Sequence, residues 1–202
     1  KSAYDDSPDD PDAMADYALL QLKVGAKPEA GRLARKTLEL RPKHPVASYV
    51  RARLFLSIGE DETAEQLLLD AHDEAAPNEH VLGLLAGLRY KEDDFEEAVR
   101  LYEIGAKHFP GDHKWQTALV RGYERLGRTD QLAEAMERTV WLDADDAQTP
   151  RKLAELALDR KDYAAAIDWA NRTLHVDVTD AEVHALLAAR GHEPYHEKRL
   201  GA

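Results

Sequence analysis

The chain has 202 residues, of which 44% are hydrophobic, and this is enough apolar material to bury a sizeable core. Its formal net charge of -12 argues against a nucleic-acid partner, because contact with phosphates needs clustered Lys and Arg. The sequence has no cysteine and no apolar run long enough to cross a bilayer. These absences exclude disulfides, thiolate metal sites and membrane insertion through such a run.

The first ten residues are predicted to be a disordered acidic linker. Prolines and aspartates dominate this stretch and its border, a composition too charged to bury anything, with acids at Asp5, Asp6, Asp9, Asp10 and Asp12. An acidic interaction tail is the alternative interpretation. Because the chain begins with Lys1 rather than an initiator methionine, we expect it to be a piece of a longer protein.

Boundary residues predict the first two helix pairs. The first pair is expected at about Pro11 to Val24 and Pro28 to Leu40, because proline is favourable as a first helical residue. In the second pair, Gly59 is expected to end the first helix and Asp61 to cap the second.

The third helix pair has the clearest pattern. Leu82, Leu85 and Leu88 recur at helical spacing within a first helix of about Val81 to Lys91. The next helix is predicted to begin after a turn, with Asp94 as its cap and Glu97 completing a capping box. It cannot continue past Phe109, because Pro110 follows.

The remaining helices are predicted in the same way. Trp115, Tyr123 and Met136 are expected in the core, and Trp141 and Trp169 stand at core-like places. Thr149 is a candidate cap before Pro150, and Thr179 with Glu182 forms a candidate capping box for a final helix at 181–190. Residues 191–202 are predicted to be a tail.

The pattern repeats every 34 residues without insertion. The windows are 11–44, 45–78, 79–112, 113–146 and 147–180, followed by a cap at 181–190. Small residues recur at two places, at Ala18, Ala52, Ala86, Ala154 and Ala188 and at Ala30, Ala64, Ala98 and Ala166. Between the helices Gly25, Gly59 and Gly127 share a third place, where glycine suits the left-handed residue that ends a helix.

This pattern resembles the tetratricopeptide repeat, which has a period of 34 residues and these small-residue places. The resemblance covers residues 11–190 and implies an all-α, right-handed α-solenoid of about five repeats with a C-terminal capping helix. The chain departs from the family at single places. Arg51, for example, stands where a core leucine is usual.

The resemblance also implies a concave groove lined by the outward face of each first helix. The helical period places an apolar half there in the first three windows and a local excess of cations in the next two. The predicted partner-binding residues are Leu22, Tyr49, Arg53, Leu56, Gly83, Gly87, Tyr90, Lys114, Arg121, Arg125, Arg151 and Lys152. The alternative is that the apolar residues pack against neighbouring first helices and the bases form a solvated face.

One family variant grips a partner's C-terminal carboxylate with spaced lysine, asparagine and arginine residues on this face. Here Ala15, Leu19 and Val50 occupy the first three of those places, so the clamp is absent from the first three windows.

One motif suggests metal chemistry but is not expected to perform it. His192, Glu193 and His196 match H-E-x-x-H, in which two histidines one helical turn apart bind zinc. Pro194 interrupts the helix that this geometry needs, and few residues follow to supply a third ligand. No nucleophile elbow or phosphate-binding glycine loop is present. We therefore expect no metal, no cofactor and no catalysis.

The sequence predicts a non-catalytic protein–protein interaction module that binds a partner segment in the concave groove. The groove's composition favours an apolar and acidic segment of another protein or peptide. The alternative is a docking or dimerising appendage of a larger enzyme whose catalytic domain lies outside this chain. A homo-oligomer is compatible with both interpretations, and the sequence assigns no compartment.

Overall fold

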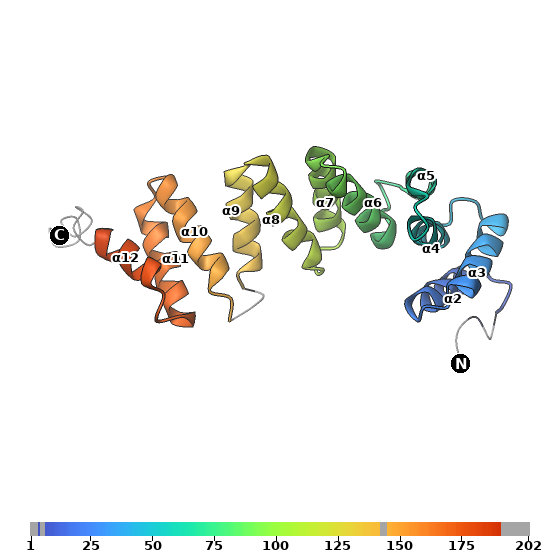
Figure 1. The fold of residues 1–202 in the computed structure, drawn as a ribbon, viewed down its shortest axis with the longest axis horizontal. Helices are drawn as coiled ribbons and strands as arrows, with labels where there is room; N and C mark the ends of the chain where they lie inside the picture. The colour runs from blue at the N-terminus through green and yellow to red at the C-terminus, as the bar shows by residue number, and fades with distance from the viewer. Residues whose placement is uncertain (1–3, 5–6, 142–144, 191–202) are drawn as a thin grey trace. The chain divides into compact units, whose positions relative to one another are not determined.

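The computed structural model describes Tyr4, residues 7–141 and residues 145–190. In this described part of the chain, all regular secondary structure is helical (Figure 1). The helices are α2 (Pro11–Lys23), α3 (Lys27–Leu40), α4 (Pro45–Leu56), α5 (Asp61–Ala71), α6 (Glu79–Lys91), α7 (Phe95–His108), α8 (Lys114–Leu126), α9 (Thr129–Thr139), α10 (Gln148–Asp159), α11 (Tyr163–Val176) and α12 (Ala181–Arg190). The predicted all-α architecture is confirmed.

The chain divides into two compact units, Lys1–Trp115 and Gln116–Ala202, with the boundary inside α8. In the first unit the helices pack as the pairs α2 with α3, α4 with α5 and α6 with α7. The first helices also contact one another, α2 with α4 and α4 with α6. In the second unit α10 packs on α11, and α12 packs on α11. Contacts between consecutive helices are what a helical repeat requires.

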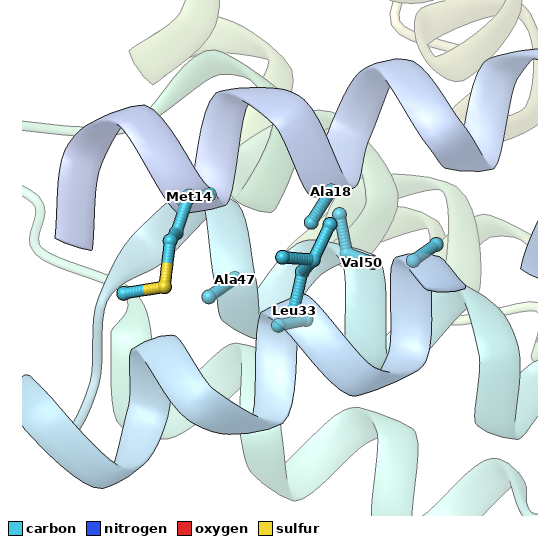
Figure 2. Packing of buried hydrophobic residues seen from close by; sticks show 8 residues of the cluster. Met14, Ala18, Leu33, Ala47 and Val50 are labelled. Carbon is cyan, nitrogen blue, oxygen red and sulfur yellow. The ribbon is translucent and has the colours of Figure 1, made fainter. Parts of the chain in front are cut away.

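The small-residue places lie in the core, where they allow close approach of the helix axes. Ala18, Ala52 and Ala86 are fully buried in first helices, as Ala30 and Ala64 are in second helices. Figure 2 shows how one cluster is built: Met14 and Ala18 of α2, Leu33 of α3 and Ala47 and Val50 of α4 converge on a shared interior. The burial of these apolar side chains stabilises the packing of the first helix pair on α4 of the second pair.

The helix starts are capped by side chains, although not always by the predicted ones. Asp94 accepts a hydrogen bond from the Glu97 backbone N–H at 3.2 Å, which confirms that cap. Glu97 does not complete the predicted box, because its carboxylate bonds Arg100 instead. Asp10 and Asn78 cap α2 and α6 in the same way as Asp94.

Three predicted caps are wrong. Asp61 is the first residue of α5, and Glu60 before it makes no side-chain cap bond. The backbone N–H of Thr149 donates to Asp146, which takes the capping role at α10. In α12 the N–H groups of the first turn donate to Asp180, and Thr179 bonds Asp177 instead.

The left-handed residue between helices recurs with the period of the sequence. Gly25, Gly59 and Gly127 have φ of 83°, 83° and 65°, as their register predicts. The same place in the third and fifth windows is held by Asp93, with φ of 61°, and Lys161, with φ of 60°. The third and fifth windows therefore keep the left-handed turn although they have no glycine at this place.

The core is completed by large residues at a few places. Trp115, Tyr123 and Met136 are buried, as predicted. A Cβ on Gly105 would overlap the Trp115 ring, so the glycine creates the space that the indole fills. Thr37 stands at the place of the first window that Gly105 holds in the third. Its buried hydroxyl donates a hydrogen bond to the Leu33 carbonyl oxygen at 3.0 Å, so the hydroxyl is satisfied in the interior.

Trp141 does not lie in the core, contrary to its core-like place in the repeat. It follows α9, and 69% of its surface is exposed.

In the N-terminal stretch the described residues contact the first helix pair, because the Tyr4 ring stacks on the Tyr17 ring with centroids 4.8 Å apart. Asp9 also pairs with Lys36 at 3.0 Å. Residues 1–3 and 5–6 of the predicted linker, the tail at 191–202 and the H-E-x-x-H motif lie outside the described residues.

Candidate functional site

The first helices of two consecutive pairs, α4 and α6, present predicted groove residues at matching places. Tyr49, Arg53 and Leu56 occupy positions i, i+4 and i+7 of α4, and Gly83, Gly87 and Tyr90 occupy the same positions of α6. This spacing puts each set on one side of its helix. We call this surface, with Leu22 of α2, the first-helix face.

Aromatic contacts join the neighbouring helices beside this face. The Tyr49 ring stacks on the His80 ring of α6, with centroids 5.0 Å apart. The Arg53 guanidinium lies 6.0 Å from the Tyr49 centroid, at the outer limit of a cation–π contact. Burial lowers the pKa of His80, so its ring is uncharged at neutral pH and stacks without the cost of a buried charge.

The apolar members of the first-helix face serve the core as well as the surface. Leu22 and Tyr49 are partly buried and pack against the core cluster shown in Figure 2. Leu56 and Tyr90 are also partly buried. Val50, which the helical period also placed on this face, is fully buried. The alternative interpretation, that apolar residues pack against neighbouring first helices, therefore describes part of this surface.

The two glycines of α6 differ in what surrounds them. A Cβ at Gly83 would lie 3.6 Å from Cη2 of Trp115, which is ordinary van der Waals contact. A Cβ at Gly87 would meet nothing within 4 Å, and Gly87 is exposed. Gly87 therefore leaves a bare stretch of helix backbone on the surface that no neighbouring side chain requires.

The predicted cations are mostly paired within the chain. Lys114 makes ion pairs with Glu79 and, at 2.9 Å, with Asp112. Burial lowers the pKa of Lys114, but the two carboxylates outweigh it and the pKa is raised overall. In the second unit Lys152 pairs with Glu124.

The three predicted arginines of the second unit differ in their pairing and exposure. Arg151 lies 3.2 Å from Glu182 of α12 and 3.6 Å from Asp180, which precedes that helix. Arg121 and Arg125 are both exposed on α8. The sequence predicted a cationic excess from residue type, and it missed the acids that neutralise most of it because these come from other turns and helices.

A hollow between the second helices of the first unit was not predicted. Residues of α3, α4 and α5 line a depression of about 400 Å³, and a second one of about 300 Å³ adjoins it. Arg51 and Phe55 of α4 line both. The one sequence signal for it was Arg51, which replaces the usual core leucine.

The second unit has a hollow of about 580 Å³ beside α11. Trp141 and Trp169 line it together with the carboxylates of Asp146 and Asp168. The Arg172 guanidinium lies 3.6 Å from the centroid of Trp141, so one face of this exposed indole is already covered.

The described residues contain no group of three or more His, Asp or Glu side chains that could hold a metal ion. None of the described helices is long and apolar enough to cross a membrane.

Comparison with solved structures identifies the fold. The chain is similar to YrrB, a TPR protein with an unusual peptide-binding site, with a TM-score of 0.64 and 15% identity over 93% of this chain and 96% of that one. It is similar to PilF of Pseudomonas aeruginosa, with a TM-score of 0.60 and 20% identity over 86% and 79% of the two chains. MamA of Desulfovibrio magneticus gives a TM-score of 0.57 and 16% identity over 85% and 97%.

The chain is therefore an all-helical repeat protein. Its helix pairs have the tetratricopeptide-repeat fold, as their 34-residue period predicts.

The sequence comparisons add one curated relative. No protein-family model matches the chain. Human protein O-mannosyl-transferase TMTC1 is 24% identical over 140 residues, which cover 69% of this chain and 16% of that protein. The chain thus spans about one sixth of the length of this relative.

Proposed function

We propose that the chain is a non-catalytic protein-interaction module whose first-helix face binds a segment of a partner protein. The observation that carries the proposal is Gly87, an exposed glycine in the interior of α6 with open space where its side chain would be. Glycine in a helix costs about 1 kcal/mol relative to alanine, and no packing partner requires it here. Close approach of a partner segment explains why this place stays bare.

The residues around Gly87 indicate the chemistry of the partner. Tyr90, Tyr49 and Leu56 offer partly buried apolar surface, which favours hydrophobic anchors in the bound segment. In the second unit the exposed Arg121 and Arg125 favour acidic residues. We propose that the first unit binds an apolar segment of the partner and that the second unit, taken by itself, binds an acidic one.

The test uses a phage-displayed library of random short peptides selected on the parent protein. Selected peptides should lose binding to Gly87→Leu, because the new side chain covers the bare backbone. The same variant should be as stable as the parent or more so, since leucine is a better helix former and its Cβ meets nothing. The matched control is Lys107→Leu, which adds an exposed leucine on α7.

The charges of the second unit have their own readout. Arg121→Glu with Arg125→Glu should weaken the binding of acidic peptides selected on the parent in a salt-dependent way and leave the melting temperature nearly unchanged, because exposed charges contribute little to folding. Peptides that bind Gly87→Leu as tightly as the parent would contradict the first-helix face as the site. Acidic peptides that bind the double variant as tightly as the parent would contradict the role of Arg121 and Arg125.

A second candidate role is favoured by the similarity to the much longer transferase. It is that of a docking or dimerising part of a larger enzyme. An antibody raised against the chain should then detect an endogenous protein several times larger than the chain itself. An endogenous protein of the chain's own mass would contradict this role.

A further inference from the structure

We propose that the groove between α3 and α5, which includes the side of α4 opposite Tyr49 and Arg53, is a second docking site. Its occupant would be a peptide segment with one acidic residue between apolar ones. Arg51 would bind the acidic residue. This site is independent of the first-helix face, and we call it the Arg51 groove.

The Arg51 groove has α4 as its floor and two apolar compartments. Leu38 of α3 and Leu67 of α5 line the larger hollow, and Leu54 and Ile58 line the smaller one. Ile58 is 72% exposed, an unusual degree for an isoleucine beside a hollow. Arg51 belongs to both hollows, so its charge lies between two apolar compartments.

Arg51 has no acidic partner among the residues that the structure describes. Its guanidinium lies 4.7 Å from the Phe55 centroid, and it makes no hydrogen bond or ion pair with the part of the chain that the structure describes. The residue is partly buried, so its charge has lost part of its hydration. A carboxylate would supply two parallel hydrogen bonds to the planar fork, which is the strongest partner for such a group.

Charge complementarity selects the sign of the occupant. Lys27 lies at one end of the groove and Arg35 at the other, with Arg51 between them. The acid that lines the groove is Glu39, which lies 3.9 Å from Arg35. The groove is therefore a net cationic surface on a chain of net charge -12, and it repels lysine-rich segments.

Residues of α3 and α5 form the two walls of the groove over α4. Gly31 faces Leu54 so closely that a Cβ would lie 3.2 Å from Cδ1 of that leucine, which holds α3 tight against α4. Thr63 and Leu67 of α5 lie one turn apart and form the opposite rim. A leucine at place 51 would add an apolar surface here, whereas arginine adds a charge and five hydrogen-bond donors.

The test uses the same phage-displayed peptide library, read on a different variant. Arg51→Leu restores the residue type that the repeat usually has, so we expect it to fold with an unchanged or higher melting temperature. Peptides that depend on the groove should carry Asp or Glu between apolar residues and should bind Arg51→Leu at least about tenfold more weakly. The matched control is Arg138→Leu, the same change at an exposed place of α9.

A double-mutant cycle assigns the contact. Replacing the peptide's acid by its amide should cost about tenfold on the parent and almost nothing on Arg51→Leu. Groove peptides should still bind Gly87→Leu, so failure of this proposal is distinguishable from failure of the first-helix face. The proposal is overturned if no selected peptide depends on Arg51, or if the acidic peptide and its amide form bind the parent equally. It is also overturned if Arg51→Leu abolishes self-association of the chain and leaves peptide binding unchanged.

Discussion

The turn between the two helices of a repeat keeps its geometry even in windows that lack the glycine predicting it. Five residues at 34-residue intervals adopt the left-handed conformation, and two of them, Asp93 and Lys161, are not glycine. For a residue with a Cβ this conformation costs roughly 1–2 kcal/mol. The strain is tolerated because the helices on both sides fix the turn.

Lys161→Gly should stabilise the second unit. Glycine adopts φ of 60° without steric cost, although the unfolded chain gains some freedom, so we expect a net gain of about 0.5–1 kcal/mol in the free energy of unfolding. Urea denaturation monitored by circular dichroism measures it. Gly127→Ala is the reciprocal control, and a loss of stability in Lys161→Gly would show that the turn is not strained.

Gly105 and Trp115 illustrate a complementary pair. Gly105→Ala should destabilise the chain by about 1–3 kcal/mol, because its Cβ overlaps a buried indole and the neighbourhood must shift. The control is Gly87→Ala, also within a helix, where open space predicts a gain of about 1 kcal/mol. Equal melting curves for the two variants would contradict the close contact.

Residue type alone predicted part of this detail. The period located Gly25, Gly59 and Gly127, and the structure confirms their conformation. Pairing of Lys114 and Lys152 with acids could not be read from the sequence, because it depends on side chains from neighbouring turns and helices. The two cations are therefore less available to a partner than their residue type suggested.

At the scale of the helix, existence and extent were predicted well and the caps less well. The helix of about Val81 to Lys91 is α6, which begins only two residues earlier, at Glu79. The caps at Thr149 and Thr179 were assigned to the residue nearest the apolar pattern. The structure gives the role to Asp146 and Asp180, because a carboxylate at those places reaches two backbone N–H groups.

The start of α8 gives a pH-dependent prediction. Asp112 accepts hydrogen bonds from the Lys114 ammonium and from its backbone N–H, which lower its pKa from 3.8 to about 2. Because the folded-state pKa is depressed, the stabilisation is fully present above the unfolded value and is lost as the pH falls from there through about 2. Asp112→Asn should therefore be less stable than the parent at neutral pH, and the difference should vanish as the pH falls below about 2.

Urea denaturation across this pH range tests the carboxylate's role. Asparagine can still cap a helix, so the variant removes mainly the charge. Lys114→Met should shrink the pH-dependent part of the difference. A difference between Asp112→Asn and the parent that stays constant with pH would refute the assignment.

At the scale of the molecule, periodicity carried the prediction of the fold and could not carry the prediction of the sites. Five windows in one phase identify helix pairs, because each pair must bury its apolar side against the next. The Arg51 groove depends on how far α3 and α5 stand apart over α4, which no spacing in the sequence encodes. Arg51 was recognised as a departure from the repeat, and its role required the contacts around it.

The neighbour-to-neighbour packing predicts which fragments fold. Trp115 on the first turn of α8 is 1% exposed, and its ring lies 6.0 Å from Phe109 and 6.5 Å from Tyr102 between centroids. It therefore covers the end of the third helix pair. A fragment of residues 1–126 keeps this cover, whereas a fragment of residues 1–112 exposes the apolar surface that the indole buries.

We expect the fragment 1–126 to unfold cooperatively and to be clearly more stable than the fragment 1–112. Trp115→Ala in the longer fragment should remove most of the difference, since truncating a buried tryptophan costs about 3–5 kcal/mol. Urea denaturation of the three proteins, followed by far-ultraviolet circular dichroism, measures it. Equal stability of the two fragments would mean that the third pair closes its own core. Equal stability of Trp115→Ala and the unmodified longer fragment would mean that α8 stabilises the first unit through residues other than the tryptophan.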